Sequence, residues 1–153
     1  MDKITKGKLG YNLLEKELLK REFEIYTPVT ENTKIDCIAI KNGALYRIQI
    51  KTIQTDGTKR VLPVRKINHN HNEYKVYHYT KQDIDIFVGV DIENEDLYII
   101  PISFIETIKS SISINKLGEY KNNFTYMEPN IGNNIGEADD IGESLTGNTE
   151  GTE

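Results

Sequence analysis

The dipeptide Asn42-Gly43 separates two apolar, β-branched segments, and it constrains the fold of this chain more than any other feature. A two-residue turn of this composition joins antiparallel strands, because it accepts the positive φ angles that a tight hairpin requires. We therefore expect strands at 35–41 and 45–53, paired as a β-hairpin.

This hairpin carries polar side chains at positions where a buried strand would be apolar. Side chains two apart share one face of a strand, so Gln49 and Lys51 point together while Ile48 and Ile50 point to the other side. Asp36, near the start of the first strand, can lie across the ladder from them. An acid, an amide and an ammonium placed together suit phosphodiester chemistry better than core packing.

The remaining elements follow from periodicity and turn residues. Leucines at helical spacing predict a helix over 7–22 with Thr5 as its N-cap, and Asp56-Gly57 predicts a second hairpin that projects as a ribbon. The other expected segments are a short strand at 23–28, a polar loop at 68–72, buried strands at 84–92 and 97–102, and a short helix at 103–110. This order predicts an α/β fold of the α+β-like kind, with a mixed sheet flanked by helices.

Composition indicates one globular domain over residues 1–128 followed by an acidic tail over 129–153 that lacks stable structure. The tail holds six of the 24 acidic residues and no Lys or Arg, which leaves 18 acids against 19 bases in the body. No segment is long and apolar enough to span a bilayer or to act as a signal peptide, so we expect a cytoplasmic protein without a membrane partner. The single cysteine, Cys37, is interpreted as a small buried strand residue.

Charge is segregated by sign along the body of the chain. Residues 41–81 contain nine Lys or Arg against two acids, whereas residues 83–106 contain seven acids and no base. Such segregation favours a surface that binds a polyanion, with an acidic side elsewhere. A solvated surface without a partner is the alternative.

Two short motifs resemble those of the PD-(D/E)XK nuclease superfamily. The superfamily pattern is an acid at the start of one strand, followed on the next strand by an acid, any residue and a lysine. Ile35-Asp36 corresponds to the first part, and Gln49-Ile50-Lys51 to the second. Further similarity lies in the glycine-containing helix start at 6–10 and in the paired strands at 83–90 and 97–102. The likeness is greatest to the small homing endonucleases of this type that are encoded in cyanobacterial group I introns.

The resemblance implies a restriction-endonuclease-like core with a DNA-binding ribbon, Mg²⁺ as cofactor, and sequence-specific double-strand cleavage of DNA. Asp36 would be a metal ligand, helped by Gln49 and the backbone carbonyl of Ile50, and Lys51 would activate water or stabilise charge. The chain departs from the pattern twice, at Gln49 and at Tyr11, where many relatives carry a Glu. Glu15, one turn later on the same helix face, is the candidate for the missing carboxylate.

Two basic or amide-rich stretches are candidates for contact with DNA. A two-stranded ribbon fits the major groove, and lysines there would contact phosphates while arginines would read guanine. The residues expected to bind DNA are Gln54, Thr58, Lys59, Arg60, Arg65, Lys66, Asn68, His69, Asn70, His71, Asn72 and Lys75. A metal pair formed by the two histidines is disfavoured, because two ligands without a third make a weak site.

Cleavage of both strands by a single active centre implies a homo-oligomer, either a dimer or a tetramer. We expect segments 99–105 and 112–126 as candidate contact surfaces, with core packing as the alternative for most of their residues. No small-molecule cofactor is expected. Three other functions stay open: a restriction endonuclease or Holliday junction resolvase, a non-catalytic DNA-binding module with a decayed nuclease site, and a protein-interaction domain.

Overall fold

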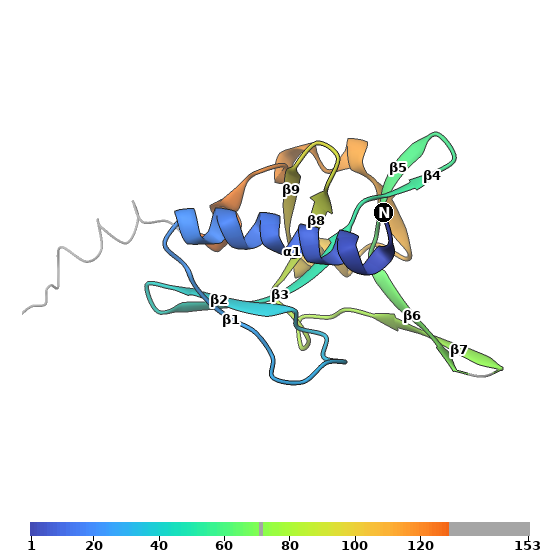
Figure 1. The fold of residues 1–153 in the computed structure, drawn as a ribbon, viewed down its shortest axis with the longest axis horizontal. Helices are drawn as coiled ribbons and strands as arrows, with labels where there is room; N and C mark the ends of the chain where they lie inside the picture. The colour runs from blue at the N-terminus through green and yellow to red at the C-terminus, as the bar shows by residue number, and fades with distance from the viewer. Residues whose placement is uncertain (71, 129–153) are drawn as a thin grey trace, which may run out of the picture.

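A computed structural model describes residues 1–70 and 72–128 of the chain. The predicted DNA contact at His71 and the predicted acidic tail at 129–153 lie outside the described residues. The centre of the fold is a five-stranded mixed sheet with the order β1-β2-β3-β8-β9 (Figure 1). Its strands are β1 (Glu24–Tyr26), β2 (Cys37–Lys41), β3 (Ala44–Thr52), β8 (Ile86–Asp91) and β9 (Asp96–Pro101).

Only the β3–β8 pair of this sheet is parallel, and the other neighbours are antiparallel. The predicted mixed sheet flanked by helices is therefore confirmed. The β2–β3 hairpin turns at Asn42 and Gly43, whose φ angles are 52° and 80°. Both values are positive, as a two-residue turn that follows the twist of its strands requires.

Helix α1 (Lys3–Lys20) crosses one face of the sheet. It begins earlier than predicted, and its N-cap is Asp2 rather than Thr5. The Asp2 carboxylate accepts hydrogen bonds from both the backbone N–H and the hydroxyl of Thr5, at 2.9 Å each. Thr5 is a suitable cap by residue type, but an acid three residues earlier satisfies the same free N–H groups.

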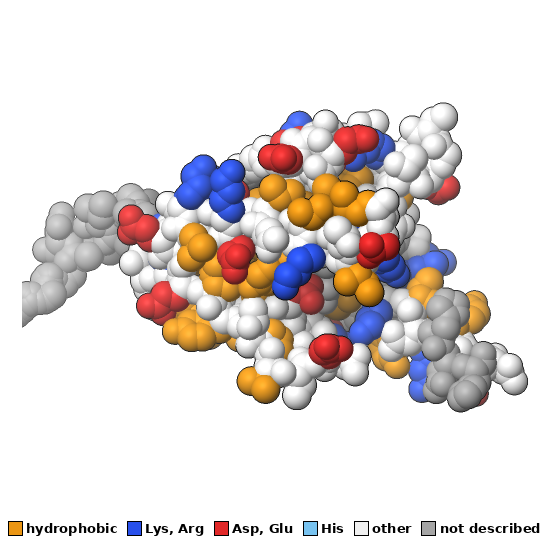
Figure 2. Space-filling model, viewed as in Figure 1, with side chains coloured by type: hydrophobic (Ala, Val, Ile, Leu, Met, Phe, Trp, Pro, Cys, Tyr) orange, Lys and Arg blue, Asp and Glu red, His pale blue; other side chains and the backbone are white. Residues whose placement is uncertain are grey.

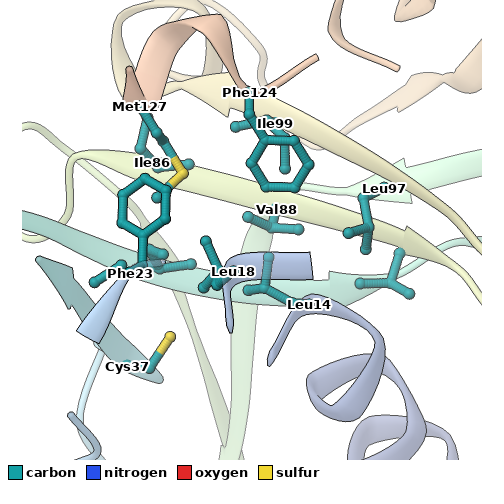
Figure 3. Packing of buried hydrophobic residues seen from close by; sticks show 13 residues of the cluster. Leu14, Leu18, Phe23, Cys37, Ile86, Val88, Leu97, Ile99, Phe124 and Met127 are labelled. Carbon is teal, nitrogen blue, oxygen red and sulfur yellow. The ribbon is translucent and has the colours of Figure 1, made fainter. Parts of the chain in front are cut away.

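The core between α1 and the sheet is a cluster of fully buried apolar side chains. Figure 3 shows Leu14 and Leu18 of the helix packing toward Val88 and Ile99 of the sheet, with Phe23 beside them. Burying one leucine side chain stabilises the fold by about 1.5–3 kcal/mol. These contacts fix the helix over β3 and β8.

Glycine at position 10 lets the start of α1 approach the end of β3. A Cβ atom at Gly10 would lie 3.4 Å from the Thr52 side chain and 3.6 Å from that of Val90. The first turns of the helix therefore lie directly beside the last residues of β3. This close approach brings helix residues to the polar end of the hairpin.

A second buried cluster fills the opposite face of the sheet, where Leu62, Phe87, Ile100 and Leu117 pack together. The elements that cover it are α2 (Ile102–Ile105), β10 (Ser111–Ser113), and the 3₁₀ turns η1 (Ile114–Lys116) and η2 (Gly118–Tyr120). The turn η3 (Phe124–Met127) instead packs into the first cluster through Phe124 and Met127.

The helix predicted at 103–110 was wrong, because α2 is a single turn, Ile102–Ile105, that follows Pro101. For the two candidate contact segments, 99–105 and 112–126, the burial of their side chains favours the alternative of core packing. Segment 99–105 is largely core, because Ile99, Ile100 and Ile105 are at most 2% exposed. Segment 112–126 also contributes to the core, because Leu117, Tyr120 and Phe124 are buried.

Two hairpins extend from the end of the molecule at which α1 begins (Figure 1). One is formed by β4 (Gln54–Asp56) and β5 (Lys59–Pro63), which pairs with β10 in a three-stranded sheet. The other is formed by β6 (Arg65–Asn70) and β7 (Glu73–His78).

The first of these hairpins agrees with the prediction and the second was not expected. A single residue, Ile53, separates the end of β3 from the start of β4. The strand that carries Lys51 therefore continues into the first hairpin, as expected. Arg65 and Lys66 belong to the second hairpin instead, and the expected polar loop at 68–72 includes the end of β6. Asparagine is depleted in strands, which is why its clustering there indicates a loop.

Among the described residues, no helix is both long enough and apolar enough to cross a lipid bilayer.

Candidate active site

Asp36 closes the hydrogen-bond ladder at the point where β2 begins. Its N–H donates to the Ile48 carbonyl at 2.7 Å, one residue before the regular pairing of the hairpin begins with Cys37 opposite Ile48. The carboxylate turns toward β3 and accepts from the Ile50 N–H at 2.7 Å. Asp36 therefore lies across the ladder from Gln49, as the sequence predicted.

The Gln49 amide connects the two oxygen atoms expected to hold a metal. Its Nε2 donates to Asp36 Oδ2 at 2.7 Å and to the Ile50 carbonyl oxygen at 3.1 Å. Gln49 is 7% exposed, a low value for a polar side chain, and these two bonds satisfy the buried amine. A single amide thus holds the carboxylate and the carbonyl in fixed positions.

A pocket of about 370 Å³ opens beside these groups, between the end of β3 and the first turns of α1. It is the place where the close approach at Gly10 brings the two elements together. Its lining residues are Lys3, Gly7, Tyr11, Asp36, Gln49, Ile50, Lys51 and Thr52. The three residues of the sequence motif therefore share one cavity with one face of the helix.

The electrostatics of the pocket are those of a partly dry site with an excess of cations. Burial raises the pKa of the Asp36 carboxyl, although the Ile50 N–H and the charges of Lys51 and Lys66 act in the opposite direction. Burial also lowers the pKa of Lys51, and the positive charge of Lys3 adds to this effect. Within residues 1–70 and 72–128, Lys51 makes no salt bridge.

The helix contributes Tyr11 to the pocket, and Glu15 is not among the lining residues. Burial, followed by the nearby charges of Cys37, Glu15 and Asp36, raises the pKa of the Tyr11 phenol to about 12. A tyrosine phenol is a neutral hydroxyl at neutral pH even without this shift. Glu15 lies one turn beyond Tyr11 and is half-buried, so the carboxylate expected from the helix is not at the pocket wall.

Cys37 has the structural role that its sequence context suggested. It is 1% exposed and packs in the core beneath the helix. Burial raises the pKa of its thiol to about 12, with smaller contributions from Asp36 and Glu15. The thiolate form that nucleophilic chemistry needs is therefore suppressed.

The donor set at the pocket fits a hard divalent cation that takes most of its ligands from water and substrate. Across the described residues, no three His, Cys, Asp or Glu side chains converge as a metal cage. Mg²⁺ prefers oxygen ligands and is commonly bound through one or two carboxylates plus substrate phosphates. The Asp36 carboxylate and the Ile50 carbonyl already lie together, and the Gln49 amide would present its oxygen after rotation.

The residues predicted to contact DNA divide between the two hairpins, and Arg60 has a structural partner. Both of its terminal nitrogens donate to the Asp91 carboxylate, at 2.6 and 2.7 Å. Asp91 is 1% exposed, so the pair ties β5 to the end of β8. The guanidinium could read guanine only by leaving this buried carboxylate.

The other basic side chains on the hairpins make no salt bridge within the described part of the chain. Pairing of Lys66 with Tyr77 and of Asn68 with Lys75 puts these four side chains on one face of the β6–β7 hairpin. Lys66 is close enough to Asp36 and Lys51 to affect the pKa of both. This face therefore continues from the pocket along the hairpin.

Gln54, Thr58 and Lys59 are exposed on the β4–β5 hairpin, and Asn72 is exposed at the end of β6–β7. Figure 2 shows Lys and Arg side chains between the start of α1 and the second hairpin. Residues 69 and 70 are placed on β6 by their backbone.

Sequence reasoning missed the two polar side chains that the helix contributes to the pocket, those of Lys3 and Tyr11. A signal for them exists, because positions 3, 7 and 11 repeat every four residues and so follow one face of a helix. Gly7, between them, carries no side chain to fill the opening, and a Cβ there would contact nothing within 4 Å.

The chain is similar to a sequence family and to a solved structure. No curated protein sequence matches the chain. Among solved structures, the bacterial homing endonuclease I-Ssp6803I is similar, with a TM-score of 0.69 and 21% sequence identity over 74% of this chain and 78% of that one. This likeness concerns the fold. Residues 1–128 match the sequence family of PD-(D/E)XK endonucleases, and the chain therefore belongs to that family.

Proposed function

We propose that this protein is a sequence-specific DNA endonuclease that makes double-strand breaks by Mg²⁺-dependent hydrolysis and serves in intron homing. The observation that carries the proposal is the pocket in which Asp36, Gln49 and Lys51 meet, next to a basic hairpin face. Membership of an endonuclease family supports the reaction class. Similarity in fold to a bacterial homing endonuclease supports the homing role.

In the proposed reaction, water attacks the phosphorus of a DNA phosphodiester, and the bond to the leaving sugar oxygen breaks. Asp36, the Ile50 carbonyl and the oxygen of a rotated Gln49 amide would hold the cation, which when bound neutralises phosphoryl oxygens and polarises water. Lys51 lies beside them without a carboxylate partner among the described residues. Its ammonium can hold a phosphate oxygen or the attacking water.

The lowered pKa of Lys51 also increases the fraction of the neutral amine, which is the form that can accept a proton from water. Glu15 stays a prediction as an additional metal ligand. It lies one turn beyond the pocket wall, so any such role requires it to reach past Tyr11.

DNA would lie across the pocket and along the two hairpins. Lys66, Asn68 and Lys75 share the face that leads away from Asp36 and are proposed to contact phosphates or base edges. Gln54, Thr58 and Lys59 are proposed to do so from the β4–β5 hairpin. Arg65 and residues 69–72 are further proposed DNA contacts.

One observation favours a second candidate, a DNA-binding module with a decayed nuclease site. Gln49 and Tyr11 leave Asp36 as the only carboxylate that lines the pocket within the described residues. Such a module would bind DNA without hydrolysing it.

Mapping of cleavage ends tests the proposal. Genomic DNA is incubated with the protein in Mg²⁺ or in EDTA, and the new ends are sequenced. We expect ends that recur at one or a few sequences in Mg²⁺ alone. Binding without new ends at high protein concentration would instead support the decayed module.

A competition experiment separates homing from resolution of DNA junctions. Four-way junctions and linear duplex that contains the mapped sequence are offered together. Preference for the linear duplex is expected, and preference for the junction irrespective of sequence would identify a resolvase.

A further inference from the structure

The helix side of the pocket presents hydrogen-bond donors rather than acceptors. Lys3, Tyr11 and Lys51 line the cavity around a single carboxylate, that of Asp36. The ammonium of Lys66 acts on the same space from the second hairpin. Three cations around one anion give the site a net positive charge when all four groups are ionised, which favours an anionic ligand.

Protein acceptors do not occupy these donors. Within the described ranges, neither Lys3 nor Lys51 nor Lys66 forms a salt bridge, and the Tyr11 hydroxyl makes no hydrogen bond. The Tyr11 ring packs against the apolar cluster under the helix, which fixes the direction of its hydroxyl. A tyrosine phenol is protonated at neutral pH, so it can donate a hydrogen bond.

We infer that Lys3 and Tyr11 form a phosphate subsite that holds a backbone phosphate of DNA on the helix side of the pocket. Lys51 faces the same space from the opposite wall, and Gly7 keeps the passage between Lys3 and Tyr11 free of side chains. Lys3, Tyr11 and Asp36 line the same cavity, so a phosphate bound here would share it with a cation held by Asp36.

This subsite rests on the proposed function, because it requires that the protein bind DNA. It differs from a metal site in its chemistry, because the Lys3 ammonium repels cations and the neutral Tyr11 hydroxyl is a weak ligand for them. Binding at the subsite is therefore expected without any divalent ion, and EDTA isolates it from metal-dependent contacts.

The test measures the affinity for a mixed-sequence duplex in EDTA over a range of salt concentrations. Loss of one phosphate contact by a lysine reduces the slope of log K against log[salt] by about 0.9. We expect this reduction for Lys3→Gln relative to the matched control Lys16→Gln. Lys16 is an exposed lysine on the same helix that does not line the pocket.

Tyr11→Phe gives an independent second readout. The substitution removes only the hydroxyl, so the packing of the ring stays and the fold is not at risk. We expect affinity to fall about three- to tenfold with an unchanged salt slope, because the lost hydrogen bond carries no charge.

The outcomes separate the subsite from the proposed function. If the wild-type protein binds duplex weakly and without salt dependence, the proposed DNA-binding function fails. If wild-type binding is strongly salt-dependent but Lys3→Gln has the slope of Lys16→Gln, or Tyr11→Phe binds like wild type, the subsite is overturned while the proposed function stands.

Discussion

At the scale of single residues, the site combines a carboxylate that is costly to ionise with a lysine that is easier to neutralise than usual. Both pKa shifts arise mainly from burial, which disfavours the carboxylate of Asp36 and the ammonium of Lys51. The opposite charges of the two residues act against these shifts. Groups whose pKa values are displaced in this way cluster at functional sites. The Gln49 amide fixes the carboxylate without adding a negative charge.

Substitution of Asp36 by Asn is predicted to separate stability from activity. Because burial raises the pKa of this carboxyl, its contribution to stability is greatest at low pH and declines as pH rises through the folded-state pKa. Burial of the charged carboxylate therefore costs stability in the folded state. Asp36→Asn should therefore abolish cleavage and leave the thermal unfolding midpoint equal or higher.

Calorimetry at neutral pH and a plasmid cleavage assay measure the two effects. A clear drop in the unfolding midpoint would show that the carboxylate stabilises the fold, which contradicts the assignment of Asp36 to function.

At the scale of secondary-structure elements, the fold brings the end of β3, the start of α1 and two hairpins to one end of the molecule (Figure 1). Strand β3 is common to the site and to the first hairpin. The Arg60–Asp91 pair fixes that hairpin to β8, because a buried carboxylate accepts from both guanidinium nitrogens.

Arg60→Ala is predicted to destabilise the protein by about 2–3 kcal/mol. This value lies below that of a fully buried pair because the Arg60 side chain is 27% exposed. Hydrogen bonding to Arg60 lowers the pKa of Asp91 from 3.8 to about 2. The contribution of the pair is therefore full above 3.8 and is lost as pH falls through about 2.

Denaturant unfolding of the wild type and the variant at several pH values tests this. The difference in unfolding free energy should shrink toward the acid end. A difference that is constant with pH, or absent at neutral pH, would show that the pair does not hold the hairpin.

The sequence predicted the elements whose signals are local. The Asn42-Gly43 turn, the alternation along β3 and the leucines of α1 each determine their element without distant contacts. The β6–β7 hairpin escaped prediction, because its asparagines resemble a loop and its pairing depends on a partner strand. The role of Arg60 was hidden for a similar reason, since Asp91 lies 31 residues away.

The same distinction applies to the site. Asp36, Gln49 and Lys51 were found because they belong to one hairpin, whose period of two determines their faces. Tyr11 stands out in the sequence only as a departure from the expected acid. Its contact with the pocket depends on how closely α1 approaches β3 at Gly10, which periodicity alone does not give.

At the scale of the whole molecule, one pocket with one motif can act on one strand at a time. The surfaces expected to mediate assembly are mostly core, so they do not explain how two sites would face one duplex. Exposed apolar side chains elsewhere include Tyr26, Val29 and Leu45, at the edge and turns near β1 and β2.

Light scattering coupled to size-exclusion chromatography is predicted to detect a dimer or tetramer, at least in the presence of cleavable DNA. The 17.5 kDa mass of one chain makes these states easy to distinguish. A monomer with and without DNA, together with cleavage of both strands, would rule out the proposed assembly.

The central claim is that the pocket around Lys51 hydrolyses DNA, and the most direct measurement is nicking of a supercoiled plasmid in Mg²⁺ by three proteins. Wild type and Lys16→Ala should nick equally, and neither should act in EDTA. Lys51→Ala should bind the plasmid but nick it about a hundredfold more slowly or not at all. Nicking by Lys51→Ala at the wild-type rate would contradict the assignment of the active site.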